Sequence, residues 1–176
     1  MSFNVNKSVC MVLDPSDKKK IVCCSFPMFT VGDHQLKFVK TYKYLGNIIT
    51  SKLRDDDDIE REIRCLYARC NILLSRYKYC SRHVKQILFQ SFCMCFYNIA
   101  LWRSFTHSTL QRFVSCYNKC VKRFFGFPKF GSMTAVLFDL GIQSCNTVIH
   151  NSDIRFREYI YCSTNCLVCA VRAVHM

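Results

Sequence analysis

The sequence predicts an α+β fold, in which a small antiparallel sheet is followed by an α-helical bundle. Runs of β-branched and aromatic residues, separated by Gly, Pro and Asp, fill the chain up to about residue 52. From residue 59 onwards, apolar residues recur at spacings of three and four, which is the period of a helix with one buried face. Ser and Gly stand where several of these periodic segments begin and end, as expected of helix caps and stops.

The sheet is predicted from short extended runs at residues 9–13, 20–24, 28–31, 34–39 and 42–49. Gly32 and Asp33 separate two of these runs, and a link of two residues that begins with Gly fits a tight hairpin. Gly46 interrupts the last run. We expect a bulge or the close approach of another backbone at Gly46, because glycine has no Cβ.

The first helix is predicted to follow four consecutive aspartates at residues 55–58 and to reach about residue 77. Its buried face should consist of Ile59, Ile63, Leu66, Cys70, Leu73 and Tyr77. Unpaired N–H groups of a first helical turn stabilise exposed carboxylates by roughly 0.3–1 kcal/mol each, which is sufficient to explain the acidic run. The alternative, a metal-binding carboxylate cluster, is disfavoured because adjacent residues at a helix start point in different directions.

A second helix is predicted for residues 82–105, with Ser81 as its N-cap. It is apolar on most sides, so we expect it in the middle of the bundle. Its longest apolar run, residues 87–102, is interrupted by polar residues and is shorter than the roughly 20 residues that span a bilayer. We therefore predict no membrane-spanning segment.

A third helix is predicted for residues 108–125, ended by Gly126 and Pro128. Its inner face should consist of Leu110, Phe113, Val114, Tyr117, Val121 and Phe124. A short helix at residues 134–139, closed by Gly141, and a last helix from Ser144 to about residue 161 complete the predicted bundle.

The charge of the helical part points to a polyanionic partner. The net charge is +13, and residues 63–138 contain twelve Lys and Arg but no Asp or Glu. A helical layer with one sign of charge repels itself unless an anion binds it, and nucleic acid is the usual such anion. The candidate phosphate-binding residues in this span are Arg64, Arg69, Arg76, Arg112, Lys119, Lys122 and Arg123.

The third helix carries the clearest part of this pattern. Arg112, Ser115, Lys119 and Lys122 recur at spacings of three and four, with Arg123 beside them, which makes a polar and basic ridge. Such a ridge can follow phosphates but reads no base sequence. The alternative, an ordinary solvated helix face, would normally include acidic residues.

Fourteen cysteines in so apolar a chain favour a reducing, intracellular compartment, cytoplasm or nucleus, and disfavour secretion. We interpret most of them, including Cys70, Cys95 and Cys120, as small buried hydrophobic residues. The tail at residues 162–176 contains Cys162, Cys166, Cys169 and His175. Zinc binding is the alternative there, but the spacing does not match known ribbon or knuckle patterns, so we expect no metal or other cofactor.

Several motifs in fixed order resemble one family. They are Phe3-Asn4-x-x-Lys7-Ser8-x-Cys10-Met11, residues 38–46 ending in Tyr44-Leu45-Gly46, the aspartate run followed by Ile59, and Leu66-Tyr67-Ala68-Arg69. Leu101-Trp102, Gly126-Phe127-Pro128 and Arg155-Phe156-Arg157 extend the similarity over most of the chain. Together these motifs resemble the reverse transcriptases of non-LTR (LINE-type, RTE-like) retrotransposons.

The resemblance implies a division of the chain. Residues 1–52 would be the last, β-rich part of a polymerase palm, residues 53–161 a thumb-like helical bundle, and residues 162–176 a Cys-rich tail. Lys7 would lie near the phosphates of the incoming nucleotide and protonate the pyrophosphate leaving group. The turn at Tyr44, Leu45 and Gly46 resembles the primer grip, and the thumb would bind an RNA or RNA–DNA template–primer duplex independently of sequence.

The family's catalytic aspartates are expected before Phe3, on an earlier strand and on a Tyr/Phe-x-Asp-Asp hairpin. Without them the two Mg²⁺ ions of phosphoryl transfer have no ligands, so Mg²⁺ is expected only in a full-length enzyme. We therefore expect a truncated copy that is catalytically inactive alone and retains nucleic-acid affinity. The alternatives are an exapted structural or protein-interaction module, which would self-associate through the incomplete palm, and a standalone polymerase, which we do not expect.

Overall fold

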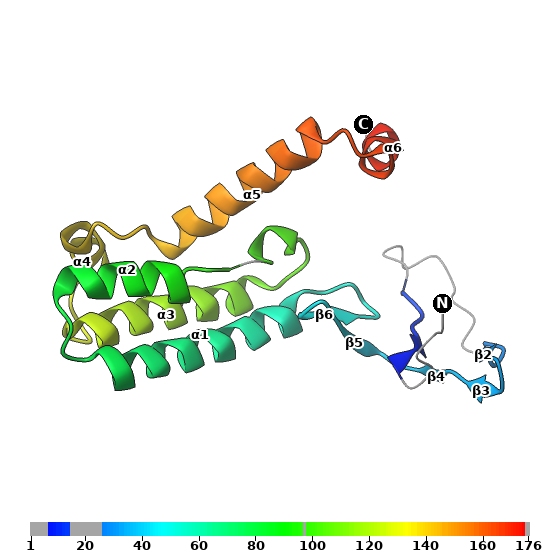
Figure 1. Ribbon diagram of the computed structural model, residues 1–176, viewed down its shortest axis with the longest axis horizontal. Coiled ribbons are helices and arrows are strands. Elements are labelled where there is room, and N and C mark those ends of the chain that lie inside the picture. The colour runs from blue at the N-terminus through cyan, green and yellow to red at the C-terminus, as the bar shows by residue number, and fades with distance from the viewer. Residues whose placement is uncertain (1–6, 15–25, 97, 175–176) are drawn as a thin grey trace.

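The computed structural model describes residues 7–14, 26–96 and 98–174, so the strand predicted at residues 20–24 lies outside this part. The predicted α+β class is confirmed: short strands occupy the chain up to Thr50, and helices follow from Asp56 (Figure 1).

The strands described are β1 (Val9–Cys10), β2 (Thr30–Val31), β3 (His34–Gln35), β4 (Lys37–Phe38), β5 (Thr41–Tyr44) and β6 (Asn47–Thr50). They form three separate two-stranded sheets, so the single small antiparallel sheet that we predicted is wrong. The β2–β3 and β5–β6 pairs are antiparallel, whereas β1 pairs with β4 in parallel. A strand of two residues offers too few backbone groups to join a wider sheet, and the long connection from β1 to β4 allows a parallel pair.

The hairpin predicted at Gly32 and Asp33 is confirmed, because these two residues link β2 to β3. Gly32 has a φ of +60°, which glycine adopts without the steric cost that a Cβ imposes. The strand register places Val31 opposite His34 across this turn.

The helices are α1 (Asp56–Tyr77), α2 (Arg82–Cys93), the 3₁₀ helix η2 (Ile99–Leu101), α3 (His107–Phe125), α4 (Met133–Leu140), α5 (Cys145–Cys162) and α6 (Cys166–Val174). The predicted caps are confirmed: Ser81 Oγ accepts from Val84 N, and Ser144 Oγ accepts from Thr147 N. Gly126 ends α3 in the left-handed region with a φ of 78°, as its position predicted.

Helices α1 and α3 lie side by side and run parallel. Two hydrogen bonds fix this direction: the Cys116 thiol, at the middle of α3, donates to Ile63 O in the first half of α1, and the Cys70 thiol donates to Cys120 O further along both helices. Helix α2 runs back along them, and Figure 1 shows α5 diverging from this group towards α6.

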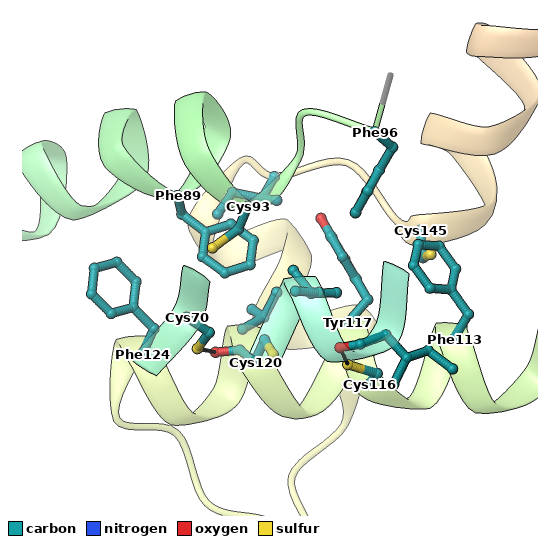
Figure 2. Packing of buried hydrophobic residues seen from close by; sticks show 14 of the residues in the cluster. Cys70, Phe89, Cys93, Phe96, Phe113, Cys116, Tyr117, Cys120, Phe124 and Cys145 are labelled. Carbon is teal, nitrogen blue, oxygen red and sulfur yellow. Dashed lines mark hydrogen bonds between the residues drawn. The ribbon is translucent and has the colours of Figure 1, made fainter. Parts of the chain in front are cut away.

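The core lies between α1, α2 and α3. The buried stripe predicted for α1 is confirmed from Ile59 to Leu73, whereas Tyr77 is only partly buried. Figure 2 shows aromatic rings at the centre of the core, among them Phe89, Phe96, Phe113 and Tyr117. The ring centroid of Phe113 lies 5.1 Å from that of Phe96 and 5.3 Å from that of Trp102, and both pairs are edge-on. Such edge-to-face pairs add to the stabilisation that burial itself provides.

The cysteines behave mainly as core residues, and none of the twelve described is in a disulfide. Cys70, Cys93, Cys116, Cys120 and Cys145 are buried among the aromatic rings (Figure 2). Burial raises the pKa of the Cys93 and Cys145 thiols to about 12, so both stay protonated at neutral pH. Cys95, which we expected in the core, is only half-buried, and its thiol donates to Ser91 O at 2.6 Å.

The second helix differs from its prediction in length and position. Helix α2 ends at Cys93, and Ile87 and Phe92 are 51% and 54% exposed, so α2 lies at the side of the bundle. After α2 the chain turns, which places both Phe96 and Trp102 against Phe113. Burial of these two rings outweighs the helix propensity of residues 94–105, which is a weak preference.

Candidate nucleic-acid interface

A strip of basic side chains follows the seam between α1 and α3. We call Arg64 of α1 together with Arg112, Lys119 and Arg123 of α3 the basic ridge. Spacings of four and seven residues place Arg112, Lys119 and Arg123 on one face of α3. On α1, Arg64 shares its face with Glu60 and Asn71 by the same spacing.

Two contacts join the α1 side of the basic ridge to its α3 side. Arg112 pairs with Glu60 near the start of the seam, and Arg123 Nη1 donates to Asn71 Oδ1 at 3.1 Å near its end. Because α1 and α3 run parallel, Arg64 and Lys119 fall between these contacts. The structure therefore brings four of the predicted residues into one continuous strip.

The charges of the ridge are only partly compensated. Arg112 forms an ion pair with Glu60, with Nη1 at 2.5 Å from Oε1, and its Nη2 donates to Oε2 at 2.9 Å, so Glu60 neutralises it. Arg123 contacts a neutral amide and keeps its charge. Arg64 and Lys119 are exposed and take part in none of the ion pairs between described residues. Three positive charges of the ridge thus face solvent without an acidic partner in residues 7–14, 26–96 and 98–174.

Three other predicted residues lie elsewhere or are engaged. Arg69 pairs with Glu62 and lies over the Phe96 ring, and its helical position is opposite to that of Arg64. Arg76 follows Arg69 by two helical turns and shares this far side. Lys122 Nζ donates to the carbonyls of Lys129 and Gly131 at 3.0 and 2.6 Å, so it holds the loop after α3.

The acidic run joins α1 to the segment that leads into α3. Asp55 Oδ2 accepts from Arg103 N and Ser104 N, both at 2.7 Å. Asp56 Oδ1 accepts from Thr106 N at 2.9 Å and from Thr106 Oγ1 at 2.8 Å. Desolvation alone would raise the pKa of Asp56, but hydrogen bonds from Thr106, Thr109 and Arg54 hold it well below its usual range. The expected stabilisation at a helix N-terminus is therefore only part of the role of these residues.

Asp58 is buried and holds three elements together. Its Oδ1 accepts from Ile48 N of β6 at 2.9 Å and from Arg61 Nε at 2.8 Å. Its Oδ2 accepts from Trp102 Nε1 at 2.9 Å. Desolvation opposes ionisation, yet these donors lower the pKa of Asp58 below its usual value, so the carboxylate is charged at neutral pH.

The aspartates do not fit a metal site. The carboxylates of three of them already accept hydrogen bonds from protein donors. Asp55 accepts from backbone N–H groups, and Asp56 accepts from Thr106 and Arg54. Asp58 accepts from Ile48, Arg61 and Trp102. Within residues 7–14, 26–96 and 98–174, no group of three or more His, Cys, Asp or Glu side chains could hold a metal ion. His175, one member of the zinc alternative, lies outside the described residues.

The β5–β6 hairpin stands at the N-terminal end of α1. Its two-residue turn consists of Leu45 and Gly46, with φ of 46° and 89°. We predicted a bulge or the close approach of another backbone at Gly46, but it lies in a hairpin turn and no other backbone of the described residues is within 4 Å of where its Cβ would be. Leu45 is 82% exposed, and a leucine in this backbone region is strained. Lys7 lies beside the hairpin, because Tyr42 of β5 donates its hydroxyl hydrogen to Lys7 O at 3.2 Å.

A cavity of about 440 Å³ lies between this hairpin and the start of α1. Tyr44, Leu45, Leu101 and Trp102 contribute to its mainly apolar lining. Leu53, which also lines the cavity, has a φ of 51° and is half exposed. The sequence gives no signal for this cavity, because its lining comes from residues 44–58 and 98–102, which are distant in the chain and are held together by contacts such as that of Trp102 with Asp58.

The chain was compared with models of protein families, with curated protein sequences and with solved structures, and none matches. Across the described residues, no helix is both long enough and apolar enough to cross a membrane.

Proposed function

We propose that this chain is a nucleic-acid-binding fragment similar to the end of the palm and the thumb of a non-LTR reverse transcriptase. It would bind an RNA or RNA–DNA template–primer duplex through phosphates, without reading sequence. The observation that carries the proposal is the basic ridge, with three charges that have no acidic partner within the part of the chain that the structure describes. The resemblance to this family rests on the ordered motifs from Phe3 to Arg157.

The dimensions of the ridge suit a duplex. From Arg112 to Arg123 a helix rises by about 16 Å, at about 1.5 Å per residue. One strand of B-DNA presents roughly five phosphates over that length of its axis. Lys119 and Arg123 are one turn apart, so both can reach the same strand.

The hairpin has a place in this proposal. Tyr44, Leu45 and Gly46 would hold the 3′ end of the primer, as the resemblance implies. The strained, exposed turn is typical of a functional site, since strain persists only where the surroundings hold it. Asp58 provides that support by fixing β6 to α1. No catalytic step is assigned to this chain, and Lys7 would be an accessory group of the full-length enzyme.

The test is duplex binding as a function of salt. The variant is a triple substitution in the ridge, Arg64→Gln, Lys119→Gln and Arg123→Gln. We expect it to reduce the slope of log affinity against log salt by about 2 to 3, because each lost phosphate contact contributes roughly 0.9. Fluorescence anisotropy with a labelled RNA–DNA duplex, between low and physiological salt, measures this slope.

The matched control is Lys37→Gln, Lys52→Gln and Arg155→Gln, which removes the same charge from exposed residues outside the ridge. We expect it to change the slope by less than half as much. Equal effects of both triple variants would show attraction by net charge alone, and binding that is insensitive to salt would contradict the proposal outright.

A second candidate is a structural or protein-interaction module, which the β-rich part favours. Each described strand belongs to a two-stranded sheet and so has an unpaired edge. Met28 and Leu45 are 73% and 82% exposed in this part. If this candidate is right, light scattering after size exclusion should give a mass above the 20.7 kDa of one chain, and Leu45→Asn should shift it towards the monomer. A clean monomer at all concentrations would remove this candidate.

A further inference from the structure

Three aromatic side chains extend into solvent at the end of the bundle that is remote from the β5–β6 hairpin. Tyr79, Phe130 and Phe138 are 93%, 92% and 90% exposed, which makes them the most exposed large apolar side chains among the described residues. We call these three residues the aromatic end. Single exposed apolar residues are common on protein surfaces, so what matters is that all three lie at one end.

Their common location follows from the topology. Tyr79 comes directly after α1, and Phe130 follows the end of α3, which is parallel to α1. Phe138 belongs to α4, which is tied to the start of α2 by an ion pair, Arg82 Nη2–Asp139 Oδ2 at 2.6 Å. Figure 1 shows α4 beside the start of α2, at the end where α1 and α3 finish.

This end is also basic. Lys78 Nζ lies 5.5 Å from the centre of the Tyr79 ring, and Lys129 Nζ lies 5.4 Å from the centre of the Phe130 ring. Asp139, the acid on α4, is paired with Arg82. The surface therefore combines accessible ring faces or edges with cations that have no acidic partner among the described residues.

A specific contact joins the aromatic end to the basic ridge. Lys122 precedes Arg123 of the ridge, and its ammonium group holds the carbonyls of Lys129 and Gly131 on both sides of Phe130. Phe130 is thereby kept close to the last turn of α3. A polyanion that follows the ridge towards the end of α3 reaches the aromatic end next.

We propose that the aromatic end binds single-stranded nucleic acid, with bases stacked on the rings and phosphates near Lys78 and Lys129. Proteins that bind single strands without sequence preference stack the bases on aromatic rings and hold the nucleic-acid phosphates with Lys and Arg side chains. This inference rests on the proposed function and extends it to the unpaired strand that continues from a duplex. An anionic membrane surface is disfavoured, because the ridge runs along the helices and would not face a bilayer that contacts their ends.

The test compares a blunt RNA–DNA duplex, the same duplex with a ten-nucleotide single-stranded extension, and a free oligo-dT. We expect wild-type protein to bind the extended duplex more tightly than the blunt one. The test variant combines Tyr79→Ala, Phe130→Ala and Phe138→Ala. It should remove this gain and weaken oligo-dT binding by on the order of tenfold or more, because each ring removed takes away the stacking energy of one base. Blunt-duplex affinity should not change.

The control replaces exposed side chains of α5 and α6: Tyr159→Ala, Tyr161→Ala and Leu167→Ala. It should bind all three ligands like wild type, and thermal melts should show that both triple variants remain folded. If blunt duplex fails to bind but oligo-dT still depends on the aromatic end, the proposed function fails while this inference stands. If the aromatic-end variant binds oligo-dT normally, or loses only sedimentation with phosphatidylserine vesicles, the inference is wrong.

Discussion

Asp58→Ala is expected to lower the free energy of unfolding by about 3–5 kcal/mol, because removing one partner of a buried, hydrogen-bonded charge pair leaves the others unsatisfied. The side chain of Asp58 is 4% exposed, and it accepts from Ile48 N, Arg61 Nε and Trp102 Nε1. Without it, the Trp102 indole N–H stays buried without an acceptor. Urea unfolding monitored by the fluorescence of Trp102, the one tryptophan of the chain, measures the change.

The neighbouring Asp57→Ala is the matched control, since Asp57 is exposed in the same aspartate run. Its expected effect is within about 0.5 kcal/mol of wild type, as for most surface substitutions. If both variants lose similar stability, the acidic run acts through the helix terminus alone and not through the contacts of Asp58.

The same carboxylate should make stability depend on pH in a definite direction. The pKa of Asp58 is lowered in the folded state, whereas an unfolded Asp titrates near about 3.9. Its contribution is therefore fully present above that pH and is lost as the pH falls through the folded pKa. In Asp58→Asn, the free energy of unfolding should fall less steeply with decreasing pH below about pH 4 than in wild type. An equally steep fall would mean that other groups cause the acid destabilisation.

Phe113→Ala should have an effect of similar size, about 3–5 kcal/mol, because it opens a cavity where the side chain is fully buried. Phe113 contacts the rings of both Phe96 and Trp102 edge-on. Its loss removes the surface on which the chain between α2 and α3 packs. Chemical denaturation, with hydrogen exchange of residues 94–105 as a local probe, would measure the loss.

Phe138→Ala is the matched control, because it makes the same substitution at a site on α4 where the side chain is 90% exposed. We expect little change in the free energy of unfolding, since no buried contact is lost. A strong effect of Phe138→Ala, or a weak effect of Phe113→Ala, would contradict the burial on which this prediction depends.

Local patterns predicted much of the helical part. The stripe from Ile59 to Leu73 and the stops at Gly126 and Gly141 were confirmed. The second helix was wrong beyond Cys93, because burial of Phe96 and Trp102 depends on Phe113, which the local pattern of residues 82–105 does not include. The single sheet was wrong because alternation shows that a strand forms but does not show which strand pairs with it.

The candidate interface shows the same division. Spacing alone predicted a polar and basic face of α3 that included Arg112, Lys119 and Lys122, with Arg123 beside it. Lys122 instead donates to the carbonyls of Lys129 and Gly131.

That Arg64 joins the basic ridge and that Glu60 neutralises Arg112 both depend on α1 lying parallel to α3. Arg69 instead pairs with Glu62 of its own helix. The acid-free span begins just after Glu60 and Glu62, yet both pair with arginines inside it, because an ion pair requires proximity in space and not in sequence.

The sequence by itself determined the class of the fold, the positions of most helices and the excess of positive charge, because each depends on composition or on periodicity within one segment. Only the tertiary structure decided the role of Asp58, the cavity beside the hairpin and which cations remain without acidic partners. These depend on segments such as residues 44–58 and 98–106, which packing brings together and which no local pattern relates.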